Sequence, residues 1–319
     1  MAPRKRFLEW VLAMVLAAGT LALVGCDEDE CVNCIEQAPI APTQVYSVSG
    51  DEMITIYWND FPEAYNTIDH YRVYSRFYQP GDEDDPERQF YEIGRVPVGV
   101  NFDPDNGQYH FVDQGEDVEN GYDYEYAVSA VASTGLESYL SFELVIDTPL
   151  PMSEIPVEVF DAGGSQSALS GFDFSLAAEG QDGRVDPGVS QTSADVRVIF
   201  REGVPYLEAV RADVHIQDYG TYTDRNGDLY FEGVSWAPEI GYSSSGVLEL
   251  IDGHVYVLEI VNEDRPGSLH YAKLGVVQIR PSTQSVRIMW AFQLVDGLPE
   301  LSAPAPREDE QVEFVPIKL

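Results

Sequence analysis

The sequence predicts an all-β protein with two successive β domains. Short runs alternate apolar and polar residues, as in 53–58, where Ile54, Ile56 and Trp58 fall on one face. Turn-forming pairs such as Asn226-Gly227 separate these runs. No run of helical length carries an apolar stripe with a 3.6-residue period. Short strands divided by turn signals favour antiparallel sheets packed as sandwiches.

The N-terminus has the layout of a secretory signal peptide, with basic residues 4–6 before an apolar stretch. Its end, Leu-Val-Gly-Cys at 23–26, resembles the lipobox of bacterial lipoproteins. The resemblance implies that residues 1–25 are removed and that Cys26 is acylated, which anchors the protein to a membrane. The competing interpretation is a transmembrane segment, since about 20 apolar residues can span a bilayer.

Residues 26–38 form an acidic tether. The Asp-Glu run at 27–30 lies where lipoproteins carry the signal that decides which membrane they are sent to. An aspartate after the lipid cysteine resembles the inner-membrane retention signal of enterobacterial lipoproteins. Acidic residues there also resemble a surface-export signal of other Gram-negative lineages. We favour the outer membrane or cell surface. Cys31 and Cys34 suit a small disulfide in an exported compartment. Their acidic neighbours disfavour a redox thiolate, and a metal site would lack its other ligands.

The net charge of −37 excludes nucleic acid as a partner, because such a surface repels phosphate. Solubility, a cation-rich partner and a high-salt habitat all remain explanations of the charge. Apolar residues make up 44% of the chain and aromatic residues 12%, which is enough to build packed cores.

Residues 39–148 contain three motifs in a fixed order. Trp58 ends the second predicted strand, Tyr71-Arg-Val-Tyr74 forms the third, and Val118-x-x-Gly121-x-x-Tyr124 follows. This segment resembles a fibronectin type III domain, and its last motif is similar to the tyrosine corner of that family. The resemblance implies a β-sandwich in which Trp58 fills the core and the Tyr124 hydroxyl bonds to the backbone. Such domains are spacer and binding modules.

Residues 152–303 predict a second, mostly antiparallel β domain, followed by an acidic, proline-rich tail at 304–319. The predicted strands include 172–176, 210–216 and 229–233. Phe-Asp-Phe at 172–174, an early Asp195 in the next strand and Tyr-Ala-Lys at 271–273 resemble, in that order, HmuY-type haem-binding lipoproteins. We expect Lys273 to pair with an acidic neighbour across the sheet.

Two ligand sites are candidates in this second domain. The resemblance implies haem, for which His215 is the best axial ligand, since it faces away from Val214 and Ile216. Asp224, Asn226 and Asp228 have the spacing of oxygen ligands in a calcium loop, but the same residues make a good hairpin turn. A plain turn and a surface histidine are the simpler interpretations.

The sequence contains no Gly-x-Ser-x-Gly, His-Glu-x-x-His or phosphate-binding glycine loop. We therefore expect a non-enzymatic envelope lipoprotein that binds a protein or glycan partner through its β-sandwiches. The alternative is capture of haem or another small ligand by the second domain. Otherwise no cofactor is expected.

Overall fold

The computed structural model describes residues 37–59, 68–77, 89–104, 106–115, 117–188, 194–263 and 265–302. The predicted signal peptide, Cys26, Cys31, Cys34 and the tail at 304–319 lie outside these residues. Residues 38–319 form one compact unit. Among the described residues, no helix is both long and apolar enough to cross a membrane.

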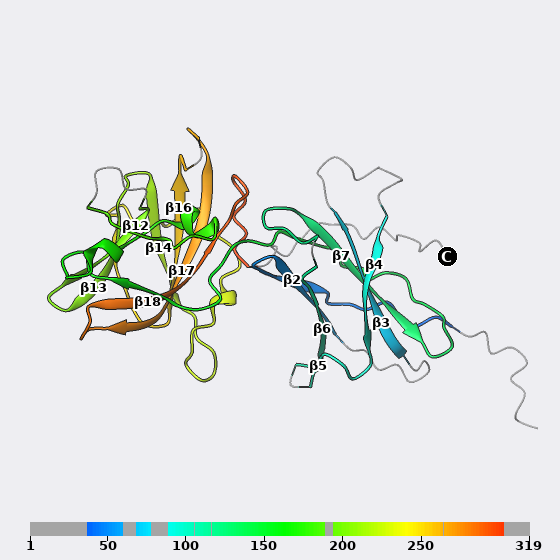
Figure 1. Ribbon diagram of the computed structural model, residues 1–319. Coiled ribbons are helices and arrows are strands. Elements are labelled where there is room, and N and C mark those ends of the chain that lie inside the picture. Colours follow the sequence, from blue (N-terminus) through cyan, green and yellow to red (C-terminus); the bar gives the residue numbers. More distant parts are fainter. Residues whose placement is uncertain are drawn as a thin grey trace, which may run out of the picture. The chain divides into compact units, whose positions relative to one another are not determined.

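The first eight strands form two four-stranded antiparallel sheets (Figure 1). One sheet has the order β1 (Tyr46–Gly50), β2 (Met53–Asn59), β6 (Gln108–Asp113), β5 (Phe102–Asp103). The other has the order β4 (Tyr91–Pro97), β3 (Ile68–Phe77), β7 (Tyr124–Ala132), β8 (Val145–Asp147). This arrangement confirms the predicted fibronectin type III-like sandwich.

The core of this first sandwich is built from the apolar side chains of the alternating sequence, which point inward as predicted. Ile54, Ile56 and Trp58 of β2 are fully buried, and the Trp58 ring lies 5.4 Å from the Tyr71 ring in an edge-to-face contact. The Tyr124 hydroxyl donates to the carbonyl of Asp117 at 2.7 Å and accepts from the backbone N–H of Glu119 at 2.9 Å. These bonds build the tyrosine corner that the sequence predicted.

The later strands form two five-stranded antiparallel sheets, which completes the predicted all-β fold. The larger has the order β14 (Val214–Thr221), β16 (His254–Val261), β17 (Leu269–Arg280), β18 (Ser285–Phe292), β9 (Val157–Phe160). The other has the order β11 (Arg184–Val185), β10 (Gly171–Phe172), β12 (Val196–Arg201), β13 (Val204–Ala209), β15 (Val247–Glu249). An apolar core that includes Val198, Leu207, Ile216 and Leu274 fills the space between them.

The opposite face of the β14-β16-β17-β18 part of the larger sheet is also covered. Val257, Tyr271 and Ala291 on that face belong to a second apolar cluster. Residues from outside the sheet complete the cluster, among them Phe231 and Leu301. A sheet covered on both faces buries the side chains of its central strand on both sides, and in β17 the whole run His270–Val276 is buried.

Three predicted strands are wrong in whole or in part. In 172–176 only β10 is strand, because the Asp173 carboxylate accepts from the N–H of Leu176 and caps the helix α2 (Phe174–Ala178). The segment 229–233 holds the 3₁₀ turn η2 (Phe231–Gly233). In 210–216 the chain turns first, with the N–H of Val214 facing the carbonyl of Arg211, so that β14 begins only at Val214. A further 3₁₀ turn, η1, spans Ser167–Leu169.

Candidate binding site

A small cavity of about 260 Å³ opens on the solvent-facing side of the β1-β2-β6-β5 sheet. We name it the tyrosine cleft. Its lining residues are Tyr46, Val48, Tyr57, Asp103, Asn106, Gln108, His110 and Tyr230. Tyr230 reaches the cleft from the second domain, in the loop just before η2. Polar and aromatic side chains dominate this lining, unlike that of an apolar ligand pocket.

The aromatic part of the tyrosine cleft is a ladder across three strands. Tyr46 of β1 pairs in register with Tyr57 of β2, and Tyr57 pairs with His110 of β6. The Tyr46 and Tyr57 rings are stacked at 5.0 Å and 10°. The His110 ring lies 5.9 Å from the Tyr57 ring. The two tyrosine rings therefore lie in two nearly parallel planes and cover part of each other, and Tyr46 is 41% exposed.

Polar groups also line the tyrosine cleft. The Tyr46 hydroxyl donates to Oε1 of Gln108 at 3.0 Å, and Nδ2 of Asn106 donates to Oδ2 of Asp103 at 2.7 Å. Partial burial raises the pKa of both Tyr46 and Tyr57, and their phenols therefore stay protonated as hydrogen-bond donors.

Lys273 holds in place the loop that supplies Tyr230. It is fully buried, and its ammonium group donates to the carbonyls of Phe231 and Val234 at 3.0 Å each and also contacts Oγ of Ser302. The Nζ atom lies 4.3 Å from the centre of the Phe231 ring. The expected pairing with an acidic neighbour across the sheet is thus wrong, because neighbouring carbonyls and a ring face satisfy the ammonium.

A second cavity, of about 390 Å³, lies beside the same loop. Its lining includes the apolar Leu229 and Phe231 and the acidic residues Asp228, Glu232 and Asp252. The loop 228–232 therefore contributes to both cavities.

His215 lies in β14, half-buried and turned away from the Val214 and Ile216 core as predicted. It pairs in register with Glu259 of β16. Burial raises the pKa of Glu259, and the interaction with His215 acts in the opposite direction. Neither cavity described above has His215 in its lining. Haem coordination by His215 stays a prediction.

Asp224, Asn226 and Asp228 form a tight turn. Oδ1 of Asp224 accepts from the N–H of Asn226 at 2.8 Å and from the N–H of Asp228 at 2.9 Å. These bonds lower the pKa of Asp224. Gly227 adopts a φ of +88°, which glycine tolerates best. The Asp224 carboxylate thus has a local structural role, and calcium binding there stays a prediction.

Another acidic group, Asp173, Asp195 and Glu263, brings one carboxylate oxygen of each residue within 4.8 Å of the others. Arg211 supplies the positive charge here, with its Nη1 atom 2.6 Å from a carboxylate oxygen of Glu263 and 3.5 Å from one of Asp195. Asp195 also accepts from the N–H of Phe174 at 2.9 Å. The Phe-Asp-Phe motif and its partner Asp195 therefore fasten α2 to β12.

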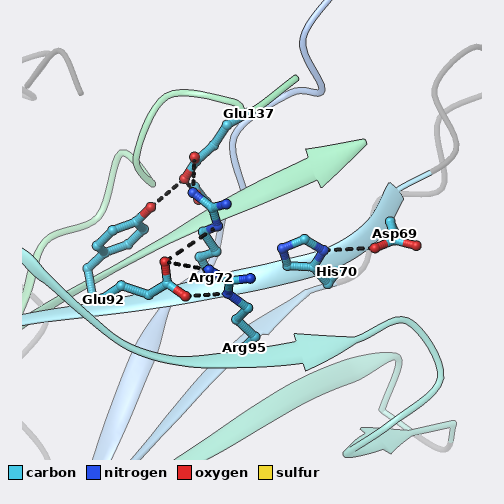
Figure 2. A network of polar contacts seen from close by, with 8 residues as sticks. Asp69, His70, Arg72, Glu92, Arg95 and Glu137 are labelled. Atoms are coloured by element: carbon cyan, nitrogen blue, oxygen red, sulfur yellow. Dashed lines mark hydrogen bonds and ion pairs between the residues drawn. The ribbon is translucent and has the colours of Figure 1, made fainter. Parts of the chain in front are cut away.

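Figure 2 shows a network of polar contacts involving β3 and β4 of the first sandwich. Arg72 contacts Glu137 at 2.6 Å and Glu92 at 3.6 Å, and Glu92 also pairs with Arg95. The hydrogen bond from Arg95 lowers the pKa of Glu92. Since an arginine engages each of these two glutamates, the network braces the sheet.

Sequence reasoning missed the tyrosine cleft. The alternation that placed Ile56 and Trp58 inside also placed Tyr57 outside, and this was a usable signal. Tyr46 and His110 needed the strand register before they could be placed beside Tyr57. Tyr230 gave no local signal, because its position depends on a loop held by the distant Lys273.

No protein-family model matches the sequence, and a search of curated proteins finds no match. Among solved structures, a fourth FNIII domain from human is 18% identical over 39% of this chain and 88% of that one, with a TM-score of 0.26. A DUF4466 family protein from Parabacteroides merdae is 9% identical over 81% of this chain and 96% of that one, with a TM-score of 0.35. The chicken CNTN1 FN1–FN3 domains are 14% identical over 81% and 69%, with a TM-score of 0.29.

Proposed function

We propose that this chain is a lipid-tethered module of the bacterial cell envelope that acts by binding a partner, without catalysis. The tether is the predicted acyl group on Cys26, and the binding surface is the tyrosine cleft. The observation that carries the proposal is the cleft on the solvent-facing side of the sheet, which is lined by the stacked Tyr46 and Tyr57 rings. Exposed aromatic residues rimmed by polar groups are typical of interaction sites.

The anchoring part is tested by mass spectrometry of the N-terminal peptide from the native protein. We expect the peptide to begin at Cys26 and to carry fatty acid. In a Cys26→Ala variant the fatty acid should be absent, and the protein should leave the membrane fraction. A native N-terminus without fatty acid would refute the tether.

The binding part is tested with the lipid-free chain from residue 27 and isolated cell envelopes in a sedimentation assay. We expect the chain to cosediment, and Tyr57→Ala to reduce the bound fraction. Tyr91→Ala is the matched control, because Tyr91 is 68% exposed on the other sheet of the same sandwich. Equal cosedimentation of all three proteins would exclude the cleft as the binding surface.

A further inference from the structure

We propose that the second domain binds a linear aliphatic polyamine in the cavity of about 390 Å³ beside the loop 228–232. We name this cavity the acidic cavity, after Asp228, Glu232 and Asp252 in its lining. It has no lining residue in common with the tyrosine cleft. The inference therefore goes beyond the proposed function, because it gives the chain a second ligand at a second site.

Two glycines let the walls of the acidic cavity come together. A Cβ atom on Gly275 of β17 would lie 2.6 Å from Cδ2 of Leu229 and 2.8 Å from Cδ2 of Phe231. A Cβ atom on Gly253, in the turn before β16, would lie 2.7 Å from Cγ2 of Thr223. The loop that carries Leu229 and Phe231 therefore packs closely on the sheet and on this turn, and the cavity is formed by the fold itself.

The lining carries negative charge without a matching positive charge. No lysine, arginine or histidine is found among the described residues that line the acidic cavity. Within the described part of the chain, the side chains of Asp228 and Glu232 make no ion pair or hydrogen bond. Oδ1 of Asp252 accepts from the N–H of Ile279 at 2.6 Å. The buried Lys273 senses the charge of Glu232, but its ammonium group donates to backbone carbonyls. The cavity is thus complementary to a cation.

The spacing of these carboxylates favours an organic cation over a metal ion. Calcium and magnesium draw several oxygen ligands to within about 2.6 Å of one point. Among the described residues, only Asp173, Asp195 and Glu263 bring three carboxylate oxygens within 4.8 Å of one another, and none of them lines this cavity. The three carboxylates of the acidic cavity are more widely spaced, so each suits a separate ammonium group.

The apolar part of the lining matches the methylene segments of a polyamine. Leu229 and Phe231 stand between two of the acidic residues along the chain, and Val276 of β17 and Met289 of β18 line the same cavity. An aliphatic stem packs along apolar surface while its ammonium end stays near anions and water. The volume of about 390 Å³ lies within the range of small-ligand pockets.

Acidic residues on a loop also serve solubility, and a polycation gathers loosely around any protein with a net charge of −37. A binding site differs from such a loose association in two ways. It depends on particular carboxylates rather than on total charge, and it depends on the aliphatic part of the ligand as well as on the ligand's charge.

The test is isothermal titration calorimetry of the lipid-free chain from residue 27 with spermidine, at about 50 mM salt, where exposed charges are only partly screened. We expect saturable binding of one spermidine per chain. Asp228→Asn and Glu232→Gln should each weaken binding about fivefold, the scale of one exposed charge pair. Glu249→Gln is the matched control and should bind like the wild type, because it removes the same charge from an exposed residue of β15 outside the lining.

A second pair of variants supplies a positive charge from the chain itself. Thr223→Arg adds a guanidinium at a lining residue, whereas Ser244→Arg adds the same charge at an exposed residue outside the lining. We expect Thr223→Arg to weaken spermidine binding at least about tenfold, and Ser244→Arg to change it less than about twofold. Tyr57→Ala should bind spermidine like the wild type, since Tyr57 lines only the tyrosine cleft.

Several results would overturn the polyamine assignment. They are the absence of saturable binding, equal weakening by Glu232→Gln and Glu249→Gln, equal weakening by Thr223→Arg and Ser244→Arg, and displacement of spermidine by an equal concentration of calcium. Loss of spermidine binding in Tyr57→Ala would place the ligand in the other cavity and also overturn it. Envelope cosedimentation tests the proposed function separately, because it is expected to depend on Tyr57 and spermidine binding is not.

Discussion

Lys273 stabilises the protein through neutral acceptors. Full burial lowers its pKa to about 7, although the carbonyls of Phe231 and Val234 and the hydroxyl of Ser302 surround the amine. Removal of the amine would leave these buried acceptors without their donor, and a buried acceptor without a partner destabilises a protein.

We therefore expect Lys273→Met to lower the free energy of unfolding by about 3 kcal/mol, measured by urea denaturation at pH 7. Arg225→Met is the control, because Arg225 is exposed and should change stability by less than about 0.5 kcal/mol. Between pH 7 and about 10 the unfolded chain keeps the Lys273 side chain protonated, whereas the folded chain releases that proton. The wild type should accordingly gain stability relative to Lys273→Met as the pH rises through this window, and a pH-independent difference would contradict the lowered pKa.

The Tyr124 hydroxyl makes a second test at the scale of one residue. Tyr124→Phe removes the bond to the Asp117 carbonyl and leaves the N–H of Glu119 without its acceptor. We expect a loss of about 1–2 kcal/mol in thermal or urea unfolding. Tyr122→Phe, at a 49% exposed neighbouring tyrosine, should leave stability unchanged. Equal effects of the two substitutions would mean that the corner bonds contribute nothing.

At the scale of elements, Arg211 connects segments that no sheet ladder joins. Its guanidinium lies close to carboxylates of Asp195, before β12, and Glu263, after β16. Burial, and then the Glu263 charge, raise the pKa of Asp195 well above its usual range. Without Arg211 these carboxylates would repel each other with no buried positive charge to offset them.

We expect Arg211→Met to destabilise the fold by about 3 kcal/mol at pH 7, and by less at pH 5, where Asp195 can take up a proton. Arg265→Met is the matched control, since it breaks the exposed pair between Arg265 and Asp296. That loss should be below about 1 kcal/mol. Urea unfolding at both pH values measures the contrast, and an equal loss at pH 5 and pH 7 would show that Asp195 does not titrate.

At the scale of the whole molecule, two buried carboxyls join the sandwiches. The Ser49 hydroxyl donates to Asp147 at 2.6 Å, and Glu300 accepts from the N–H of Thr148 at 3.2 Å. The backbone N–H of Ser49 also donates to the carbonyl of Ser302 at 2.6 Å. Burial raises the pKa of Asp147, and burial together with the Asp147 charge raises that of Glu300.

The folded state therefore binds protons that the unfolded chain, with a glutamate pKa of about 4.3, has released at neutral pH. The stabilisation that these raised pKa values contribute is present at low pH and is lost as the pH rises. Glu300→Gln keeps the hydrogen bonds and removes the ionisation, so it should be more stable than the wild type at pH 8 and nearly equal at pH 5. Glu154→Gln, at an exposed position, should show no such trend. Thermal unfolding at both pH values measures the difference between the two proteins, and a difference that does not change with pH would count against the raised pKa of Glu300.

Local chemistry made much of this fold predictable. The alternation of apolar and polar residues along the second strand predicted that Trp58 lies in the core. The spacing of Val118, Gly121 and Tyr124 predicted the tyrosine corner. The prediction failed at α2, where one aspartate cap outweighed the strand pattern of Phe172 and Phe174. It failed also for the binding surface, because the cleft and the Lys273 contacts join residues far apart in the chain.

The position of Ser302 has a consequence for biosynthesis. Its carbonyl accepts from Ser49 and its hydroxyl meets Lys273, so one late residue ties together the first sandwich and the centre of the second domain. A ribosome releases these atoms only after every strand described here has been made. A nascent chain must wait for residues 298–302 before these contacts can form, and premature termination just upstream would leave Ser49, Thr148 and Lys273 without their contacts to Glu300 and Ser302.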